Sequence, residues 1–220
     1  MNGPVPPRAV VFDLDGTIVD SLPLVLAAIR HGIGPFGAEP TMDIFARLGG
    51  PPAQFMATLV DDPRHVPEAM RRMFVYHRDN AHLIRPFAGA RELLQQLRAV
   101  GRQSALWTGR DRRSTDGLLQ ANGLGEFFAT VVCGDDLPSH KPDPAGLREI
   151  MRRLELESSE TLLVGDADVD VLGADACGVA AVLIRHEREI APAILAKCRQ
   201  VVSTPAEAFA EVRRCVGRPA

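Results

Sequence analysis

Short apolar segments, each four to five residues long and rich in β-branched and aliphatic side chains, recur along the chain. Continuous apolar runs of this length are typical of strands that are buried on both faces of a sheet. We therefore predict strands at Ala9–Phe12, Ser104–Trp107, Thr130–Cys133, Thr161–Val164 and Ala180–Ile184. Because helical patterns or a longer insert separate successive runs, the alternation predicts parallel strands joined by crossover helices.

The segments between the predicted strands carry helical periodicity with clear end signals. In Ala90–Gly101 the leucines recur at helical spacing, and the pattern stops at a glycine, which is a common C-terminal cap. Asp111–Gly123 behaves in the same way and ends in Asn-Gly. These patterns predict an α/β fold whose core is a doubly wound, Rossmann-like parallel sheet.

The alternation of strands and helices is interrupted between the first strand and Pro86. This segment contains several helical patterns and no convincing strand. Gly-Pro, Pro-Pro and Asp-Pro breakers separate its helical segments, which are 22–32, 43–50, 52–60 and 66–84. We predict a Rossmann-like core of residues 1–18 plus 86–220 and a helical cap domain, 19–85, inserted after the first strand. An insert at the carboxyl edge of a doubly wound sheet is placed to act as a lid, although helices that simply extend the core are the alternative.

The composition is that of an ordinary globular protein, with 220 residues, 46% hydrophobic residues and a formal net charge of −3. Its basic residues are scattered rather than gathered in a stripe, so we expect no nucleic-acid partner. The N-terminus lacks a basic segment followed by a long apolar one, and no apolar run approaches the ~20 residues of a membrane span. The four cysteines stand far apart, and we interpret them as reduced thiols. We therefore expect a cytoplasmic protein with no membrane partner.

Lysine is rare in this chain, because only Lys141 and Lys197 occur among 25 basic residues. A genome that favours arginine codons is the simplest cause. Under such a bias, a position that keeps lysine is one where a compact point charge is needed and a planar guanidinium would not fit. This argument singles out Lys141, which lies in a turn between two prolines.

Two carboxylates, Asp13 and Asp15, directly follow the first predicted strand. In an extended backbone their side chains point to the same side, while Leu14 points the other way. Two carboxylates brought this close in a partly dry cleft raise at least one pKa or require a cation. We favour the cation, because the apolar run before Asp13 and the Gly16 turn after it place both acids at the carboxyl edge of a sheet.

Three further signals lie at the ends of later strands. Thr108 and Gly109 offer a hydroxyl and an unobstructed backbone N–H, which suit a phosphate oxygen. Lys141 offers a cation, and the acidic run Asp166–Asp170 ends another strand. Each signal alone is more often a helix cap or a solvated surface residue. Their order and their shared placement are much harder to obtain by accident.

Four motifs of the chain resemble, in order, those of the haloacid dehalogenase-like hydrolases. They are DLDGT at Asp13–Thr17, the hydroxyl residue Thr108, KPDP at Lys141–Pro144, and the acidic segment Gly165–Gly178. The resemblance spans nearly the whole chain. It implies a phosphatase that uses a nucleophilic aspartate and Mg²⁺.

The resemblance implies a catalytic role for three residues. Asp13 would be the nucleophile that attacks phosphorus and becomes an aspartyl-phosphate. Asp15 would protonate the departing alkoxide and later deprotonate the attacking water, so its pKa must lie above that of Asp13. Lys141 would neutralise the phosphate and keep Asp13 ionised.

The resemblance also implies phosphate and metal ligands. The substrate-binding residues would be Gly16, Thr108, Gly109 and Lys141. The Mg²⁺ ligands would be Asp13, Asp15 through its carbonyl, Asp166, and Asp170 directly or through water. The family often has Asn or Ser where this chain has Gly109, so we expect Arg110 to compensate for the missing side-chain contact.

The presence of Asp15 favours phosphoester chemistry over the carbon–halogen and carbon–phosphorus reactions of relatives that replace it. DGTIVDSLP is similar to the opening of phosphoglycolate phosphatases, so we expect a small phosphorylated metabolite, phosphoglycolate-like or a sugar phosphate. A sugar phosphomutase of the same family is the alternative. Such mutases tend to carry a basic residue three positions after the cap glycine, and counting from Gly49 this place holds Pro52.

A signalling receiver that carries a phospho-aspartate is an alternative from another class. Its acceptor would lie at the end of the third strand, where this chain has Asp135 and Asp136. The first-strand pair of aspartates and the helical insert argue against it, because such modules usually lack a cap. Whether the protein is a monomer or a homodimer stays open at this stage.

Overall fold

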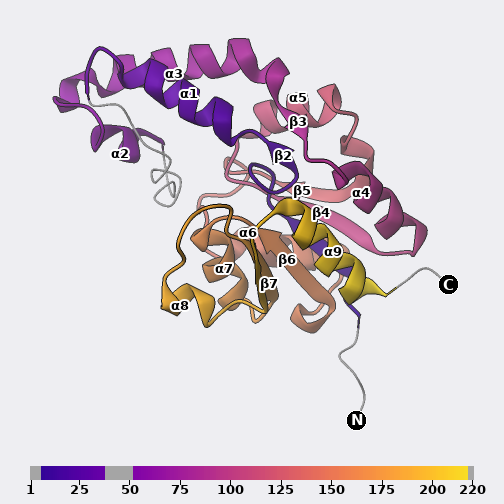
Figure 1. Cartoon of the computed structure of the whole chain (residues 1–220). Coiled ribbons are helices and arrows are strands. Elements are labelled where there is room, and N and C mark those ends of the chain that lie inside the picture. Colours follow the sequence, from indigo (N-terminus) through magenta and orange to yellow (C-terminus); the bar gives the residue numbers. More distant parts are fainter. Residues whose placement is uncertain (1–5, 38–51, 218–220) are drawn as a thin grey trace. The chain divides into compact units, whose positions relative to one another are not determined.

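The computed structural model describes residues 6–37 and 52–217. The helix predicted within 43–50, and Gly49 with it, lie outside the described residues. The contact pattern divides the chain into two units, Met1–Val19 with Pro86–Ala220 and Asp20–Arg85 (Figure 1). This division lies one residue from the boundary placed after residue 18. That the helical unit is a cap stays a prediction.

A six-stranded sheet forms the centre of the first unit. Its strands are β1 (Ala9–Phe12), β4 (Gln103–Trp107), β5 (Phe128–Val132), β6 (Thr161–Gly165), β7 (Ala180–Ile184) and β8 (Gln200–Val202). They lie in the order β5-β4-β1-β6-β7-β8, and every neighbouring pair is parallel. This is the strand order of the doubly wound Rossmann fold, in which the direction of winding reverses between β1 and β6. The predicted α/β fold class is therefore confirmed.

Three of the five predicted strands differ from the observed ones by one or two residues at an end, because β4 starts at Gln103, β5 runs from Phe128 to Val132 and β6 ends at Gly165. β5 starts at Phe128, two residues before the predicted start, and in this added segment Phe128 is buried while Ala129 is exposed. β8 was not predicted, since its three residues are half-buried or exposed and carry no apolar run. The two-residue strands β2 (Val19–Asp20) and β3 (Arg85–Pro86) pair with each other where the chain passes between the units, and they too lack a sequence signal.

The helices of the first unit alternate with its strands. They are α4 (Ala90–Ala99), α5 (Arg112–Ala121), α6 (Ala145–Leu154), α7 (Asp168–Asp175), α8 (Pro192–Leu195) and α9 (Pro205–Val216). The carboxylate of Asp111 caps α5 by accepting a hydrogen bond from Ser114 N. Side chains from β1, β4 and β6 form a buried cluster with Leu147 and Ile150 of α6 and Ala174 of α7. This packing fixes α6 and α7 against the sheet that carries the site.

The second unit is helical. It contains α1 (Leu22–Ile33), α2 (Pro52–Ala57), α3 (Val66–Asn80) and two short 3₁₀ turns, Pro63–His65 and Ala81–Leu83. The helix predicted over 66–84 therefore ends at Asn80. Apolar residues of α1 and α3, among them Ile29, Ile33 and Met73, make the core of this unit. Within the described parts of the chain, every helix is too short or too polar to cross a bilayer.

Candidate active site

Asp13 lies immediately after β1, at the point where the strand order reverses. Its backbone N–H donates to the carbonyl oxygen of Val164 at 2.9 Å, which continues the ladder between β1 and β6 beyond the last residue of β1. The side chain is 12% exposed, and its Oδ1 accepts a hydrogen bond from Lys141 Nζ at 2.7 Å. The parallel sheet thus holds a buried carboxylate at its carboxyl edge, where doubly wound folds bind ligands.

Lys141 lies in the loop between β5 and α6. Its Nζ donates to Asp13 Oδ1 at 2.7 Å, to Asp170 Oδ1 at 2.6 Å and to the carbonyl oxygen of Trp107 at 2.7 Å. An ammonium group has three N–H donors, so all of them are used. Burial alone would lower the pKa of Lys141, but Asp13 and Asp170 outweigh burial and raise it. Lys141 is therefore a permanently charged cation at the centre of the site.

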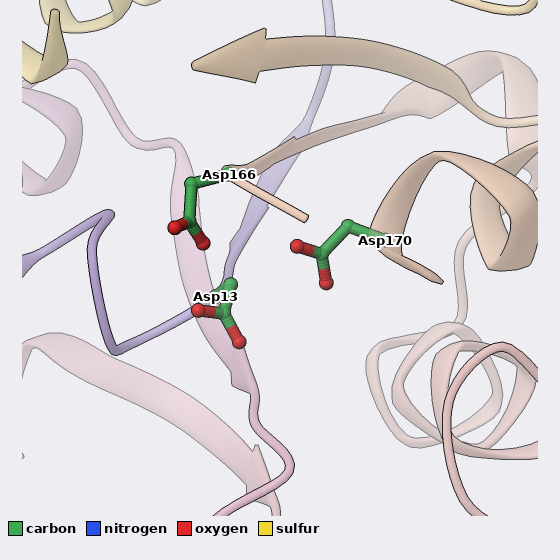
Figure 2. Close-up of side chains that lie close together, drawn as sticks. All are labelled: Asp13, Asp166 and Asp170. Atoms are coloured by element: carbon green, nitrogen blue, oxygen red, sulfur yellow. The ribbon is translucent and has the colours of Figure 1, made fainter. Parts of the chain in front are cut away.

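Three aspartates converge beside this ammonium group. One carboxylate oxygen from each of Asp13, Asp166 and Asp170 lies within 4.8 Å of the other two. Figure 2 shows these three side chains close together. Asp166 follows β6 directly, and Asp170 belongs to the first turn of α7. The Oδ2 of Asp170 accepts a hydrogen bond from Ala167 N at 3.0 Å, so this carboxylate also caps the helix, where the helix dipole favours negative charge.

The aspartate cluster holds more negative charge than Lys141 compensates. Burial raises the pKa of Asp13 to about 7, with further increases from Asp170 and Asp15, while Lys141 lowers it. Burial, Asp13 and Asp170 raise the pKa of Asp166 well above its ordinary value. Carboxylate oxygens this close together are hard ligands that suit Mg²⁺ or another divalent cation of this type. The donor set therefore fits the metal that the sequence motifs imply.

Asp15 has a different partner. Arg110 Nε donates to its Oδ2 at 3.0 Å, and Arg110 Nη2 donates to its Oδ1, which makes a bidentate ion pair. The Arg110 side chain is 9% exposed. The carboxylate of Asp15 is not among the three of the cluster described above, and the metal contact predicted for Asp15 concerns its carbonyl and stays a prediction. Arg110, which we expected to compensate for Gly109, binds Asp15 in this structure.

The predicted phosphate ligands lie around the same edge of the sheet. Thr108 is 2% exposed, and its Oγ1 accepts a hydrogen bond from Arg110 N at 3.1 Å. Beside Gly109 the space is open, because a Cβ there would meet no atom within 4 Å. Gly16 has a φ of +76°, which favours glycine, and it turns the chain back so that its N–H reaches the carbonyl oxygen of Val19. Phosphate binding by these residues stays a prediction.

Sequence reasoning missed two basic residues that follow β7. His186 Nε2 donates to the carbonyl oxygen of Gly16 at 2.9 Å and lies 3.8 Å from Asp166 Oδ2. Arg188 donates to Asp168 Oδ1 at 3.0 Å and to the carbonyl oxygen of Asp166. Both residues come from the carboxyl end of a correctly predicted strand. The carboxyl ends of parallel strands lie at one edge of the sheet, so polar residues that follow β7 could have been predicted as candidates for the site.

The aspartates that favoured a signalling receiver serve local structure. Asp135 Oδ1 accepts a hydrogen bond from Arg112 N at 2.7 Å, at the start of α5. Asp136 accepts from Cys133 N at 2.8 Å and pairs with the Arg112 guanidinium. Neither residue joins the aspartate cluster described at the sheet edge. The receiver interpretation thus loses the residues on which it depended.

Comparison with known proteins gives consistent matches. A family model described as "Haloacid dehalogenase-like hydrolase" matches residues 10–184. A Pseudomonas fluorescens Pf-5 protein named phosphoglycolate phosphatase is 34% identical over 201 residues, covering 84% of this chain and 73% of that protein. A crystal structure from Haemophilus somnus 129PT, described as a predicted phosphoglycolate phosphatase, matches with a TM-score of 0.81 at 22% identity over 95% of this chain and 99% of that one. A structure described as a putative β-phosphoglucomutase from Thermotoga maritima matches with a TM-score of 0.74 at 25% identity over 94% of this chain and 98% of that one.

Proposed function

We propose that this protein hydrolyses a small phosphorylated metabolite with Mg²⁺ through an aspartyl-phosphate intermediate. The premise is that the chain belongs to the haloacid dehalogenase-like hydrolase family and is a phosphatase. The substrate class that we favour is phosphoglycolate-like, with sugar phosphates next. Two observations support this choice: the DGTIVDSLP opening of the chain and the phosphoglycolate phosphatase name of a 34% identical relative.

The observation that carries the proposal is the buried ion pair between Lys141 and Asp13. A nucleophilic carboxylate has to be ionised when it attacks, and burial among other aspartates raises the pKa of Asp13 to about 7. The Lys141 ammonium group, 2.7 Å from Asp13 Oδ1, acts in the opposite direction and favours the charged form. The same cation is placed to attract the dianionic phosphate of a substrate to this edge of the sheet.

The residues that would hold the metal are Asp13, Asp166 and Asp170, together with the backbone carbonyl of Asp15. When bound, Mg²⁺ supplies positive charge that balances the aspartates and the phosphoryl oxygens. The chain's own residues add to this balance, because Lys141 pairs with Asp13 and Asp170, and Arg188 donates to Asp168 Oδ1 and to the carbonyl oxygen of Asp166. His186 holds the Gly16 carbonyl next to Asp166.

In the proposed reaction the Asp13 carboxylate attacks phosphorus, and a new P–O bond forms as the ester P–O bond breaks. Asp15 gives its proton to the departing alkoxide and then takes a proton from the water that hydrolyses the aspartyl-phosphate. Thr108 and the N–H of Gly109 bind phosphoryl oxygens during both steps. Because Arg110 occupies both oxygens of Asp15 in this structure, at least one of these hydrogen bonds has to break before Asp15 reaches the leaving oxygen.

We assign the helical unit Asp20–Arg85 the role of a cap that selects the substrate, because it is inserted directly after the first motif. The proposed compartment is the cytoplasm. The four free thiols support this assignment, because a reducing compartment keeps cysteines unpaired.

The test is a screen of the purified protein against phosphoglycolate, hexose phosphates, nucleotides and pyrophosphate, with Mg²⁺ and with a chelator. We expect phosphate release that requires the metal and is fastest with a small phosphorylated acid or sugar. Absence of phosphate release from every compound would contradict the proposal. Interconversion of hexose 1- and 6-phosphates without net phosphate release would instead support the mutase alternative, which the Thermotoga maritima likeness keeps open.

A further inference from the structure

Trp107, the last residue of β4, lies directly against the catalytic lysine. Lys141 Nζ is 4.7 Å from the centre of the Trp107 ring and donates to the Trp107 carbonyl oxygen at 2.7 Å. Both side chains are nearly enclosed, with Trp107 3% and the Lys141 side chain 7% exposed. An ammonium group at this distance from an indole ring is attracted by the ring's negative face, and the attraction is stronger where water is excluded.

Two glycines leave the space that the indole ring occupies. A Cβ at Gly146, in α6, would lie 2.2 Å from Trp107 Nε1. A Cβ at Gly173, in α7, would lie 2.4 Å from Trp107 Cη2. Real Cβ atoms do not approach other atoms so closely, so any larger residue at either position would displace the ring. The indole is therefore held between two helices, with its position relative to Lys141 fixed by the packing.

Packing alone explains why Trp107 is buried. It does not explain why the indole ring lies against the Lys141 ammonium group. The three N–H donors of Lys141 already bind Asp13, Asp170 and the Trp107 carbonyl. A phosphate oxygen that enters has to take one of these donors. The attraction to the ring needs no N–H, so it persists while a hydrogen bond is exchanged.

We infer that Trp107 is a positioning residue for Lys141, whose indole ring keeps the ammonium group in place while its hydrogen bonds pass between the aspartates and the substrate phosphate. The inference rests on the proposed function, in which Lys141 contacts that phosphate. Trp107 itself touches neither the substrate nor the reacting atoms in this assignment.

The first test replaces the indole with fluorinated indoles. Trp107 is the only tryptophan in the sequence, so biosynthetic incorporation of mono-, di- and trifluorotryptophan changes one ring in the full-length protein. Fluorine withdraws electron density from the ring while adding little volume. We expect kcat/KM to fall stepwise with the number of fluorines, by roughly tenfold for the trifluoro protein. An unchanged kcat/KM across the series would overturn the inference.

The second test does not depend on activity. The chain has two lysines, so labelling with ε-¹³C-lysine gives two methylene signals, and Lys197 is an internal reference. We expect the Lys141 signal to be shifted upfield by the ring current of the indole, and Trp107→Leu to remove this shift without moving the Lys197 signal. A Lys141 signal that is the same in both proteins would overturn the inference. If the Lys141 signal shows the upfield shift but the protein hydrolyses none of the phosphate esters, the proposed function is wrong. The position of Lys141 over the indole ring would still be correct.

Discussion

Charged side chains form two contrasting kinds of ion pair in the first unit. At the sheet edge, Lys141 binds Asp13 and Asp170 across 128 and 29 residues of sequence, and its side chain is 7% exposed. On α6, Glu149 binds Arg152 and Arg153, three and four residues away, and the Arg152 side chain is 71% exposed. Both sets have similar N–O distances. The distances alone therefore do not show which pairs matter.

Burial separates the two sets. Water and salt screen the exposed pairs of α6, so breaking one of them changes little. Removing one partner of a buried pair leaves a charge without compensation, which costs about 3–5 kcal/mol. The difference teaches that burial, rather than distance, marks the pairs at the sheet edge as candidates for a functional role.

The largest effect is expected for Asp13→Asn. The amide cannot act as the nucleophile, so kcat for the best phosphate ester should fall by roughly 10⁴-fold or more. Steady-state phosphate release measures this loss. The matched control is Glu149→Gln, a change of the same kind in the exposed set, which should keep full activity. Turnover by Asp13→Asn close to that of the unchanged protein would remove the nucleophile assignment.

Lys141→Met is expected to have the next largest effect, on both activity and stability. The change leaves Asp13 and Asp170 buried without their cation, so the free energy of unfolding should fall by about 3–5 kcal/mol. Urea unfolding measures this fall. Lys141→Arg should rescue little, because a planar guanidinium does not fit the three acceptors that the compact ammonium group contacts. Full rescue by arginine would show that only the charge matters.

The aspartate cluster predicts a link between metal, pH and stability. Burial raises the pKa of Asp13 from 3.8 to about 7, so the folded chain keeps a proton that the unfolded chain releases. This contribution to stability is present below about pH 4 and is lost as the pH rises through about 7. Without metal, the melting temperature should therefore decrease over this range.

Mg²⁺ should oppose that decrease, because it binds the deprotonated cluster and stabilises the folded chain. The melting temperature, measured with and without Mg²⁺, should differ most at the upper end of the range. Asp170→Asn serves as the comparison, since it removes one carboxylate and should reduce the Mg²⁺ effect. A Mg²⁺ effect that does not depend on pH would contradict the assignment of the cluster as a metal site.

A smaller effect is expected for His186→Ala. It removes the hydrogen bond to the Gly16 carbonyl and a side chain beside Asp166, so Mg²⁺ affinity should fall by roughly tenfold. Isothermal titration calorimetry with Mg²⁺ measures the change. His140→Ala, in an exposed position of the loop before Lys141, is the control and should bind Mg²⁺ normally. If His186→Ala and His140→Ala bind Mg²⁺ with equal affinity, His186 does not contribute to metal binding.

The smallest effect is expected within the exposed set. Hydrogen bonds from Arg152 and Arg153 lower the pKa of Glu149 to about 2, yet Glu149 is only half-buried and both arginines are exposed to solvent. Glu149→Gln should leave the urea midpoint unchanged within error, because water replaces the lost partners. A clear loss of stability would show that the contrast between the two sets is smaller than their burial suggests.

The sequence was sufficient to predict which backbone positions converge. Asp13, Lys141 and Asp166 each come after a strand whose apolar run is legible, and parallel strands bring their carboxyl ends to one edge. Side-chain partners were not predictable in this way. That Arg110 binds Asp15, rather than facing a phosphate, depends on the direction in which the chain leaves β4. Nothing in the residue pattern encodes that direction.

Other features were missed because their signals are short or non-local. β8 has only three residues at the edge of the sheet, and they are half-buried or exposed, so no apolar run of strand length marks it. His186 and Arg188 look like surface residues until the fold places them against Gly16 and Asp166. The space for Trp107 depends on two glycines from different helices, which no local pattern connects.

The central claim is that Asp13, held by Lys141 at the edge of the sheet, carries the phosphoryl group during turnover. The most direct measurement is acid quenching of the enzyme with its best substrate, reduction with borohydride and peptide mass spectrometry. An aspartyl-phosphate is reduced to homoserine, whereas a free carboxylate is not. We predict homoserine at position 13 alone. Homoserine at another aspartate, or none anywhere in an enzyme trapped during turnover, would contradict the account.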